Sequence, residues 1–222
     1  MNSKQSLIFR AAQAGLYGKT FLFSQGSITD ALFVFLDGKP EEESLAALER
    51  QFMARPWVCL TEAWEKSVKS HFQNLQIFAR YLMIPQSSFT FPLLQTLPKE
   101  YQLEAMDEVA FYQHPFGQGE NYSSYSQFAA EGAGAVVWKN GEIVASASSF
   151  LSLNGELELD VSTKEEHRVL GLATACISKM LEQCMRKGFT VHWDAQNETS
   201  KHIAQKFGFE VEEEYCVYYK AE

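Results

Sequence analysis

Residues 156–173, ELELDVSTKEEHRVLGLA, decide the fold of this chain. Apolar and acidic residues alternate over 156–161, which predicts a strand with one apolar face. The polar segment 163–170 predicts a loop. From about residue 171 to 187 the apolar residues recur at a helical period, and Gly188 follows as a C-terminal cap. The stretch therefore reads as a strand, a loop and an amphipathic helix.

The elements around this stretch predict the fold class. Residues 134–138 and 143–150 predict the two strands of a hairpin, because Asn140-Gly141 between them tolerates positive φ. Alternation over 191–195 predicts another strand, 198–207 a short helix and 209–219 a last strand. The order hairpin, strand, helix, strand, helix, strand predicts an α/β fold, of the α+β kind with a mixed sheet.

The N-terminal half predicts a second, smaller domain. Prolines at 85, 92 and 98 punctuate a stretch without helical period, so we place a boundary between domains 1–97 and 98–222. Residues 20–24 and 31–36 predict strands separated by Gly26-Ser27. One helix opens at Pro40 and a second spans about 62–81. Aromatic residues on the second helix predict the core of a small α/β domain.

Composition limits the partners. The 222 residues carry a formal net charge of −9, which argues against nucleic acid and anionic membrane surfaces. No apolar stretch reaches the ~18 residues of a membrane span, and the opening residues lack a secretory signal, so we expect a cytoplasmic protein. The four cysteines lack metal-site spacing, and we interpret them as reduced core residues.

The loop before the predicted helix is a candidate anion site. The first N–H groups of a helix have no internal partners, and the helix dipole adds positive charge there. Gly171 lets the backbone approach a phosphate, Ala173 keeps the next turn narrow, and Arg168 can add a bidentate contact. The alternative is an ordinary helix N-terminus that faces solvent.

Two motifs carry a family resemblance. Arg168-Val169-Leu170-Gly171-Leu172-Ala173 resembles the pyrophosphate-binding signature Gln/Arg-x-x-Gly-x-Gly/Ala of the GNAT superfamily of N-acetyltransferases. Residues 197–209 resemble its Asn-x-x-Ser…Ala…Gly-Phe segment. The wider chain is similar to a bacterial subgroup, the zwittermicin-resistance-type acetyltransferases, which carries an N-terminal α/β extension. The chain departs from the family at Val169 and Leu170, where glycine and a basic residue are common.

The resemblance implies a coenzyme site and a fold. It implies a C-terminal GNAT fold, acetyl-CoA as co-substrate and no metal. Coenzyme A would lie where the strands at 158–161 and 191–195 splay apart. The implied coenzyme contacts are Val161, Thr163, Arg168, Val169, Leu170, Gly171, Leu172, Ala173, Thr174, Asn197 and Ser200. The alternative for Asn197 is a helix N-cap.

Catalytic candidates follow from the reaction. An amine must be neutral to attack a thioester, and Glu158 or Asp160 could take its proton or position a water, although the sequence leaves open which strand face meets the substrate. The alternative for both carboxylates is a solvated strand face. Tyr215 or Tyr218 could protonate the departing thiolate, as GNAT enzymes often use a late tyrosine, and the alternative is a sheet aromatic. His167, in the loop, is expected to meet solvent or a phosphate, and neither it nor His192 is predicted to be catalytic.

The leading hypothesis is an N-acetyltransferase that moves an acetyl group from acetyl-CoA to a primary amine of a small molecule, by direct attack in a ternary complex. One alternative is a non-catalytic sensor or scaffold that binds acyl-CoA. Another is an enzyme that acetylates a protein N-terminus or lysine. A homodimer is left open.

Overall fold

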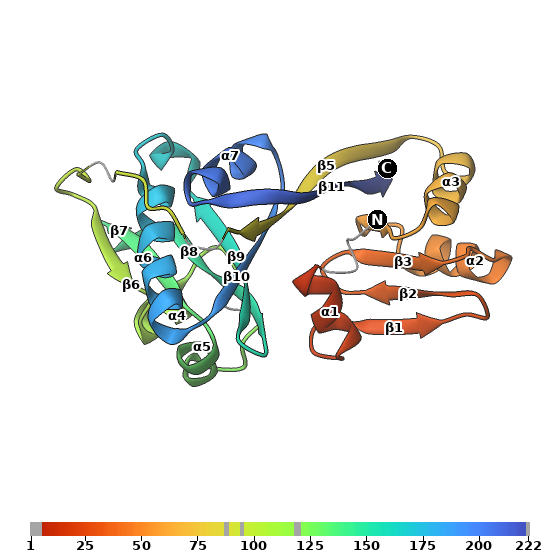
Figure 1. Cartoon of the computed structure of the whole chain (residues 1–222), viewed down its shortest axis with the longest axis horizontal. Helices are drawn as coiled ribbons and strands as arrows, with labels where there is room; N and C mark the ends of the chain where they lie inside the picture. Colours follow the sequence, from red (N-terminus) through yellow and green to blue (C-terminus); the bar gives the residue numbers. More distant parts are fainter. Residues whose placement is uncertain (1–5, 87–88, 94–95, 118–120, 221–222) are drawn as a thin grey trace. The chain divides into compact units, whose positions relative to one another are not determined.

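The computed structural model describes residues 6–86, 89–93, 96–117 and 121–220, which form two compact units. The N-terminal unit contains the chain up to Leu82, together with Asp194–Lys201 and the segment from Val211 onward. The C-terminal unit contains Met83–Trp193 and His202–Glu210 (Figure 1). The predicted boundary between residues 97 and 98 does not coincide with this division. As a boundary between independently folding domains it stays a prediction.

The C-terminal unit is built on a mixed sheet with strand order β10-β9-β8-β7-β6. The strands are β6 (Gln102–Ala105), β7 (Gly134–Lys139), β8 (Glu142–Leu153), β9 (Glu156–Thr163) and β10 (Thr190–Ala195). Neighbours are antiparallel except β9 and β10, which are parallel. The predicted hairpin is confirmed, because Asn140 and Gly141 connect β7 to β8 with φ of 51° and 79°.

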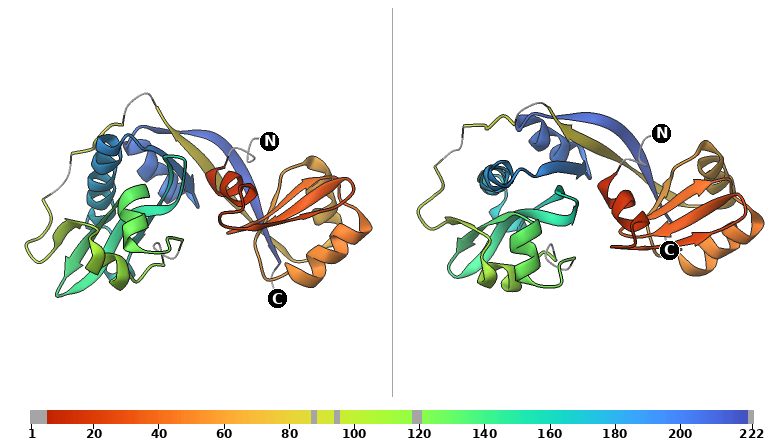
Figure 2. Two further views of the ribbon diagram at one scale, coloured as in Figure 1. Left: turned by 90° about the horizontal axis from the view of Figure 1, so that it is seen from below. Right: turned by 60° about the horizontal axis from the view of Figure 1, so that its bottom comes forward.

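Helix α6 (Leu172–Lys187) packs on β7 and β8, and the right-hand view of Figure 2 looks almost along its axis. It ends as predicted at Gly188, whose φ of 72° lets its N–H bond the carbonyls of Cys184 and Met185. Cys176 and Cys184 are buried along its apolar side. The remaining helices that supply residues to this unit are α4 (Glu108–Gln113), α5 (Tyr125–Glu131) and part of α7 (Glu198–Lys206).

The N-terminal unit has a second run of strands, in the order β1-β2-β3-β4-β11-β5. They are β1 (Lys19–Leu22), β2 (Gly26–Asp30), β3 (Val34–Gly38), β4 (Trp57–Cys59), and most of β11 (Phe209–Lys220) and of β5 (Leu75–Pro85). Its helices are α1 (Leu7–Gln13), α2 (Glu42–Gln51) and α3 (Glu62–His71). Strand β3 is parallel to β4, whereas β4 and β11 are antiparallel, so this run is also mixed.

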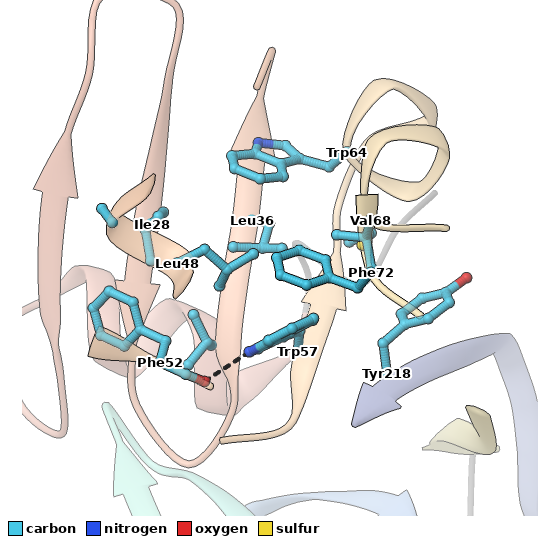
Figure 3. Packing of buried hydrophobic residues seen from close by; sticks show 12 residues of the cluster. Ile28, Leu36, Leu48, Phe52, Trp57, Trp64, Val68, Phe72 and Tyr218 are labelled. Atoms are coloured by element: carbon cyan, nitrogen blue, oxygen red, sulfur yellow. Dashed lines mark hydrogen bonds between the residues drawn. The ribbon is translucent and has the colours of Figure 1, made fainter. Parts of the chain in front are cut away.

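Aromatic side chains fill the core of the N-terminal unit (Figure 3). Trp57 and Trp64 are fully buried, and each indole N–H finds a backbone carbonyl, that of Phe52 at 2.8 Å and that of Asp37 at 3.0 Å. Buried indoles need such partners to avoid an unpaired donor. The aromatic residues are therefore core, as the sequence predicts.

Three local predictions for this unit are wrong. The second helix ends at His71 rather than near residue 81, because Phe72 and Asn74 leave helical geometry, and residues 75–85 form β5. Gly26-Ser27 begins a strand instead of separating two. Cys216 is exposed on β11, whereas the other three cysteines are buried and all four are free. Among the described residues, no helix is both long and apolar enough to cross a membrane.

Candidate functional site

The segment that leads into α6 has the geometry of an anion site. It runs from Lys164 through a single 3₁₀ turn, Glu165–His167, to Gly171. Gly171 is the N-cap with φ of 76°, a left-handed conformation that side chains disfavour. A Cβ at this position would meet no atom within 4 Å, so the space in front of the helix N-terminus is open. The unpartnered N–H groups of the first helical turn adjoin that space.

Val169 and Leu170, the two positions that depart from the family signature, lie on the surface of this loop. Val169 has φ of 66° and a fully exposed side chain, and Leu170 is partly exposed. A β-branched residue in the left-handed region is strained. Glycine is common at this position in the family, and the backbone conformation gives the physical reason.

Strands β9 and β10 pair over only three residues, Glu156–Glu158 with Thr190–His192. Within the described residues of the C-terminal unit this parallel ladder goes no further, while β9 continues to Thr163 paired with β8 on its other edge. The edge of β9 after Glu158 can therefore accept an extended ligand as an added strand. The hydroxyl oxygen of Thr163 is buried without a hydrogen-bond partner in the structure, which suits a polar ligand at this end of the strand.

The two candidate carboxylates lie on the sheet face that packs against α5. A Cβ at Gly134 would meet the side chains of Ser148 and of Phe128 in α5, and Ser148 pairs with Asp160. Because side chains alternate along a strand, Glu158 shares this face with Asp160. Glu158 is buried and Asp160 half-buried. The structure shows which face carries the two carboxylates, and their role toward a substrate stays a prediction.

A histidine–glutamate pair on this same face is a feature that sequence reasoning missed. Nε2 of His192 lies 2.6 Å from a carboxylate oxygen of Glu156, across the β9–β10 ladder. The sequence predicts no catalytic role for His192, and only the strand register brings it to Glu156. Parallel pairing of 156–158 with 190–192 leaves no local sequence signal.

The remaining candidates belong to the N-terminal unit, apart from the loop. Asn197 accepts a hydrogen bond from the backbone N–H of Ser200 at 2.9 Å, which is the geometry of an N-cap at the start of α7. This confirms the capping role for Asn197. The coenzyme contacts implied for Asn197 and Ser200 stay predictions.

The hydroxyls of both candidate tyrosines donate hydrogen bonds to carboxylates inside the N-terminal unit. The hydroxyl of Tyr215 donates to Asp194 at 2.5 Å, and that of Tyr218 donates to Glu65 at 2.8 Å. Burial, and then the charge of Asp194, raises the pKa of Tyr215 well above its ordinary value. Burial and the hydrogen bond to Glu65 likewise raise the pKa of Tyr218. Neither environment strengthens a tyrosine as a proton donor.

Comparison with known proteins agrees with this geometry. Residues 1–218 match the family described as GNAT acetyltransferase. An uncharacterized N-acetyltransferase of Bacillus subtilis (strain 168), YdfB, is 33% identical over 129 residues, 55% of this chain and 49% of that protein, so the match spans about half the length of this curated relative. The crystal structure of a GCN5-related N-acetyltransferase-like protein from Streptococcus suis is similar with a TM-score of 0.81 and 26% identity, over 96% of this chain and 92% of that one. A GCN5-related N-acetyltransferase from Kribbella flavida shares the fold, with a TM-score of 0.60 and 16% identity over 96% and 94% of the two chains.

Proposed function

The chain belongs to the GNAT acetyltransferase family, and we propose that it transfers an acetyl group from acetyl-CoA to the primary amine of a small molecule. The observation that carries the proposal is the left-handed Gly171 at the N-terminus of α6, with open space where a side chain would be. Pyrophosphate needs converging backbone N–H groups and an unobstructed approach, and this position provides both.

We assign coenzyme binding to the segment from Val161 to Thr174. The backbone N–H groups of Val169–Thr174 would hold the pyrophosphate, with Arg168 as a charged contact. The free edge of β9 at Val161 and the buried hydroxyl of Thr163 would meet the pantetheine arm. By family resemblance Asn197 and Ser200 would add contacts.

We assign proton removal from the acceptor to the carboxylate face of β9. The neutral amine nitrogen attacks the thioester carbonyl carbon, the carbon–sulfur bond breaks, and coenzyme A leaves as its thiolate. Asp160 is the better candidate for the proton, because it is more accessible than the buried Glu158. The thiolate is a good leaving group, since a thiol pKa near ~8.5 makes protonation by an acid a modest need. The Tyr215 and Tyr218 hydroxyls already donate elsewhere.

Calorimetric titration with coenzyme A and acetyl-CoA tests the site. We expect the wild-type chain to bind both and Gly171→Glu to bind neither, because the new carboxylate occupies the phosphate position. Gly155→Glu is the matched control: Gly155 has φ of 83° and open space at its Cβ, so it carries the same strain and charge in the turn between β8 and β9. Equal binding by wild type and Gly171→Glu would refute the site.

Thioester consumption with a panel of amines tests the activity. Free thiol released only when an amine is present supports acetyl transfer, and the panel identifies the acceptor. The exposed apolar pair Val169-Leu170, in place of glycine and a basic residue, favours a second candidate, an acyl-CoA sensor without turnover. That candidate predicts coenzyme binding without amine-dependent thiol release. Release with peptide N-termini or lysines alone would instead indicate a protein acetyltransferase.

A further inference from the structure

A chain of hydrogen bonds in the C-terminal unit ends on the residue just before Arg168. Nζ of Lys139 lies 3.1 Å from the hydroxyl oxygen of Tyr101, and that oxygen lies 3.0 Å from Nδ1 of His167. The Lys139 ammonium also sits over the Tyr101 ring, 4.6 Å from its centroid. The Tyr101 and His167 rings meet edge to face with centroids 5.7 Å apart.

The three residues come from separate segments, so the contact is tertiary. Tyr101 directly precedes β6, Lys139 is the last residue of β7, and His167 ends the 3₁₀ turn of the loop. Tyr101 is buried, and a backbone bond from His167 N–H to the Lys164 carbonyl at 2.9 Å holds the turn. These hydrogen bonds therefore anchor the loop to the sheet immediately before the residues that we assign to phosphate binding.

The chemistry of Lys139 fixes which atoms donate and which accept in these hydrogen bonds. An ammonium can only donate, so the Tyr101 oxygen accepts from Lys139. The hydroxyl proton of Tyr101 is then available to Nδ1 of His167, which accepts it. In the neutral imidazole the remaining proton lies on Nε2, so His167 presents an N–H donor on the side of the ring away from Tyr101.

The charge of the loop explains why such a donor matters. Glu165 and Glu166 are exposed acids, and Lys164 is paired with Glu142 at 3.1 Å. Val169 and Leu170 add no charge. A polyanionic ligand at this loop therefore meets few positive groups of the loop itself apart from Arg168.

We propose that Tyr101 and Lys139 are positioning residues that hold His167 as a hydrogen-bond donor to a phosphate group of coenzyme A. The inference rests on the proposed function and adds three residues to its site. Lys139 polarises the Tyr101 hydroxyl, Tyr101 fixes the ring and tautomer of His167, and Nε2–H of His167 contacts the phosphate. The Nε2–H of His167 supplies a contact to phosphate, which Leu170 cannot make in place of the basic residue common at that position in the family.

Calorimetric affinity for coenzyme A tests this with four variants. His167→Ala should weaken binding about tenfold or more, the usual effect of losing a hydrogen bond to a charged group. His167→Gln keeps an N–H donor near the Nε2 position and should recover most of the affinity. Tyr101→Phe should weaken binding about threefold to tenfold, and should have no further effect in a His167→Ala background, because Tyr101 acts through His167.

Controls separate this role from a structural one. Tyr112→Phe removes an exposed hydroxyl and His71→Ala an exposed imidazole, and both should bind coenzyme A like wild type. Normal affinity in His167→Ala, no recovery in His167→Gln, or an undiminished Tyr101→Phe effect without His167 would overturn the inference. The proposed function would still stand in that case if the wild-type chain binds coenzyme A and Gly171→Glu does not. A wild-type chain that does not bind coenzyme A overturns both.

Discussion

The hydroxyl of Tyr215 donates a 2.5 Å hydrogen bond to Oδ2 of Asp194, and Nε of Arg80 binds Oδ1 of the same carboxylate at 3.1 Å. Arg80 also donates to the backbone carbonyl of Asp194 at 3.0 Å. The Asp194 side chain is only 3% exposed, so both carboxylate oxygens are satisfied in a buried network of the N-terminal unit. The network gives the Asp194 carboxylate a structural role.

Asp194→Asn should destabilise the N-terminal unit by about 3–5 kcal/mol, the range for breaking a buried ion pair, because Arg80 keeps its charge without a counter-ion. Urea unfolding followed by tryptophan fluorescence measures the change. Glu49→Gln removes an acid from the exposed pair with His71 and should cost less than about 1 kcal/mol. Equal, small effects of the two substitutions would contradict the network.

Tyr215→Phe separates a structural role from a catalytic one. We expect a loss of about 1.5–3 kcal/mol in the free energy of unfolding, since the hydrogen bond is buried and its acceptor is charged. Acetyl transfer per folded molecule should change little. Tyr219→Phe is the matched control, because Tyr219 lies on the same strand, β11, and is only half-buried. A fall in turnover of about 100-fold or more with the fold intact would return Tyr215 to the role of general acid.

The C-terminal unit is predictable from sequence because its signals are local. The Asn140-Gly141 turn, the alternation over β9 and the capping Gly188 each act within a few residues, and each element is confirmed. Family resemblance then identifies the loop before α6. The contacts of Tyr101 with His167 and of Glu156 with His192 depend on tertiary pairing, which leaves no periodic trace in the sequence.

The N-terminal unit is less predictable because its local signals mislead. Residues 62–81 carry one apolar stripe, yet α3 stops at His71 and Phe78 on β5 is exposed. Hydrophobic spacing over such a span cannot distinguish a long helix from a helix followed by a strand. Strand β11, near the end of the chain, lies between β4 and β5, which come from its first half. Sequence proximity therefore gives no guide to this pairing.

Val169→Gly should stabilise the loop. Val169 has φ of 66° and a fully exposed side chain, so glycine relieves strain and loses no packing. We expect a gain of up to about 1 kcal/mol in unfolding free energy, and unchanged or tighter coenzyme A binding. Val109→Gly, at an exposed helical position of α4, should instead lose a few tenths of a kcal/mol, about the propensity difference. A destabilised Val169→Gly would show that the valine is not strained.

Alkaline pH should weaken the N-terminal unit through Tyr215 and Tyr218, two of its buried tyrosines. Burial first, and then an acidic neighbour, raises the pKa of Tyr215 and of Tyr218 above the ordinary value of 10.0. Above about pH 10 the unfolded chain has released these phenolic protons while the folded chain retains them, so the free energy of unfolding falls as pH rises. Below that pH the contribution is fully present. Urea unfolding across this range measures the slope, which should flatten in Tyr215→Phe/Tyr218→Phe. The phenolate absorbance of the folded protein gives the second measurement: if all nine tyrosines ionise near pH 10 before unfolding, the two environments are not as described.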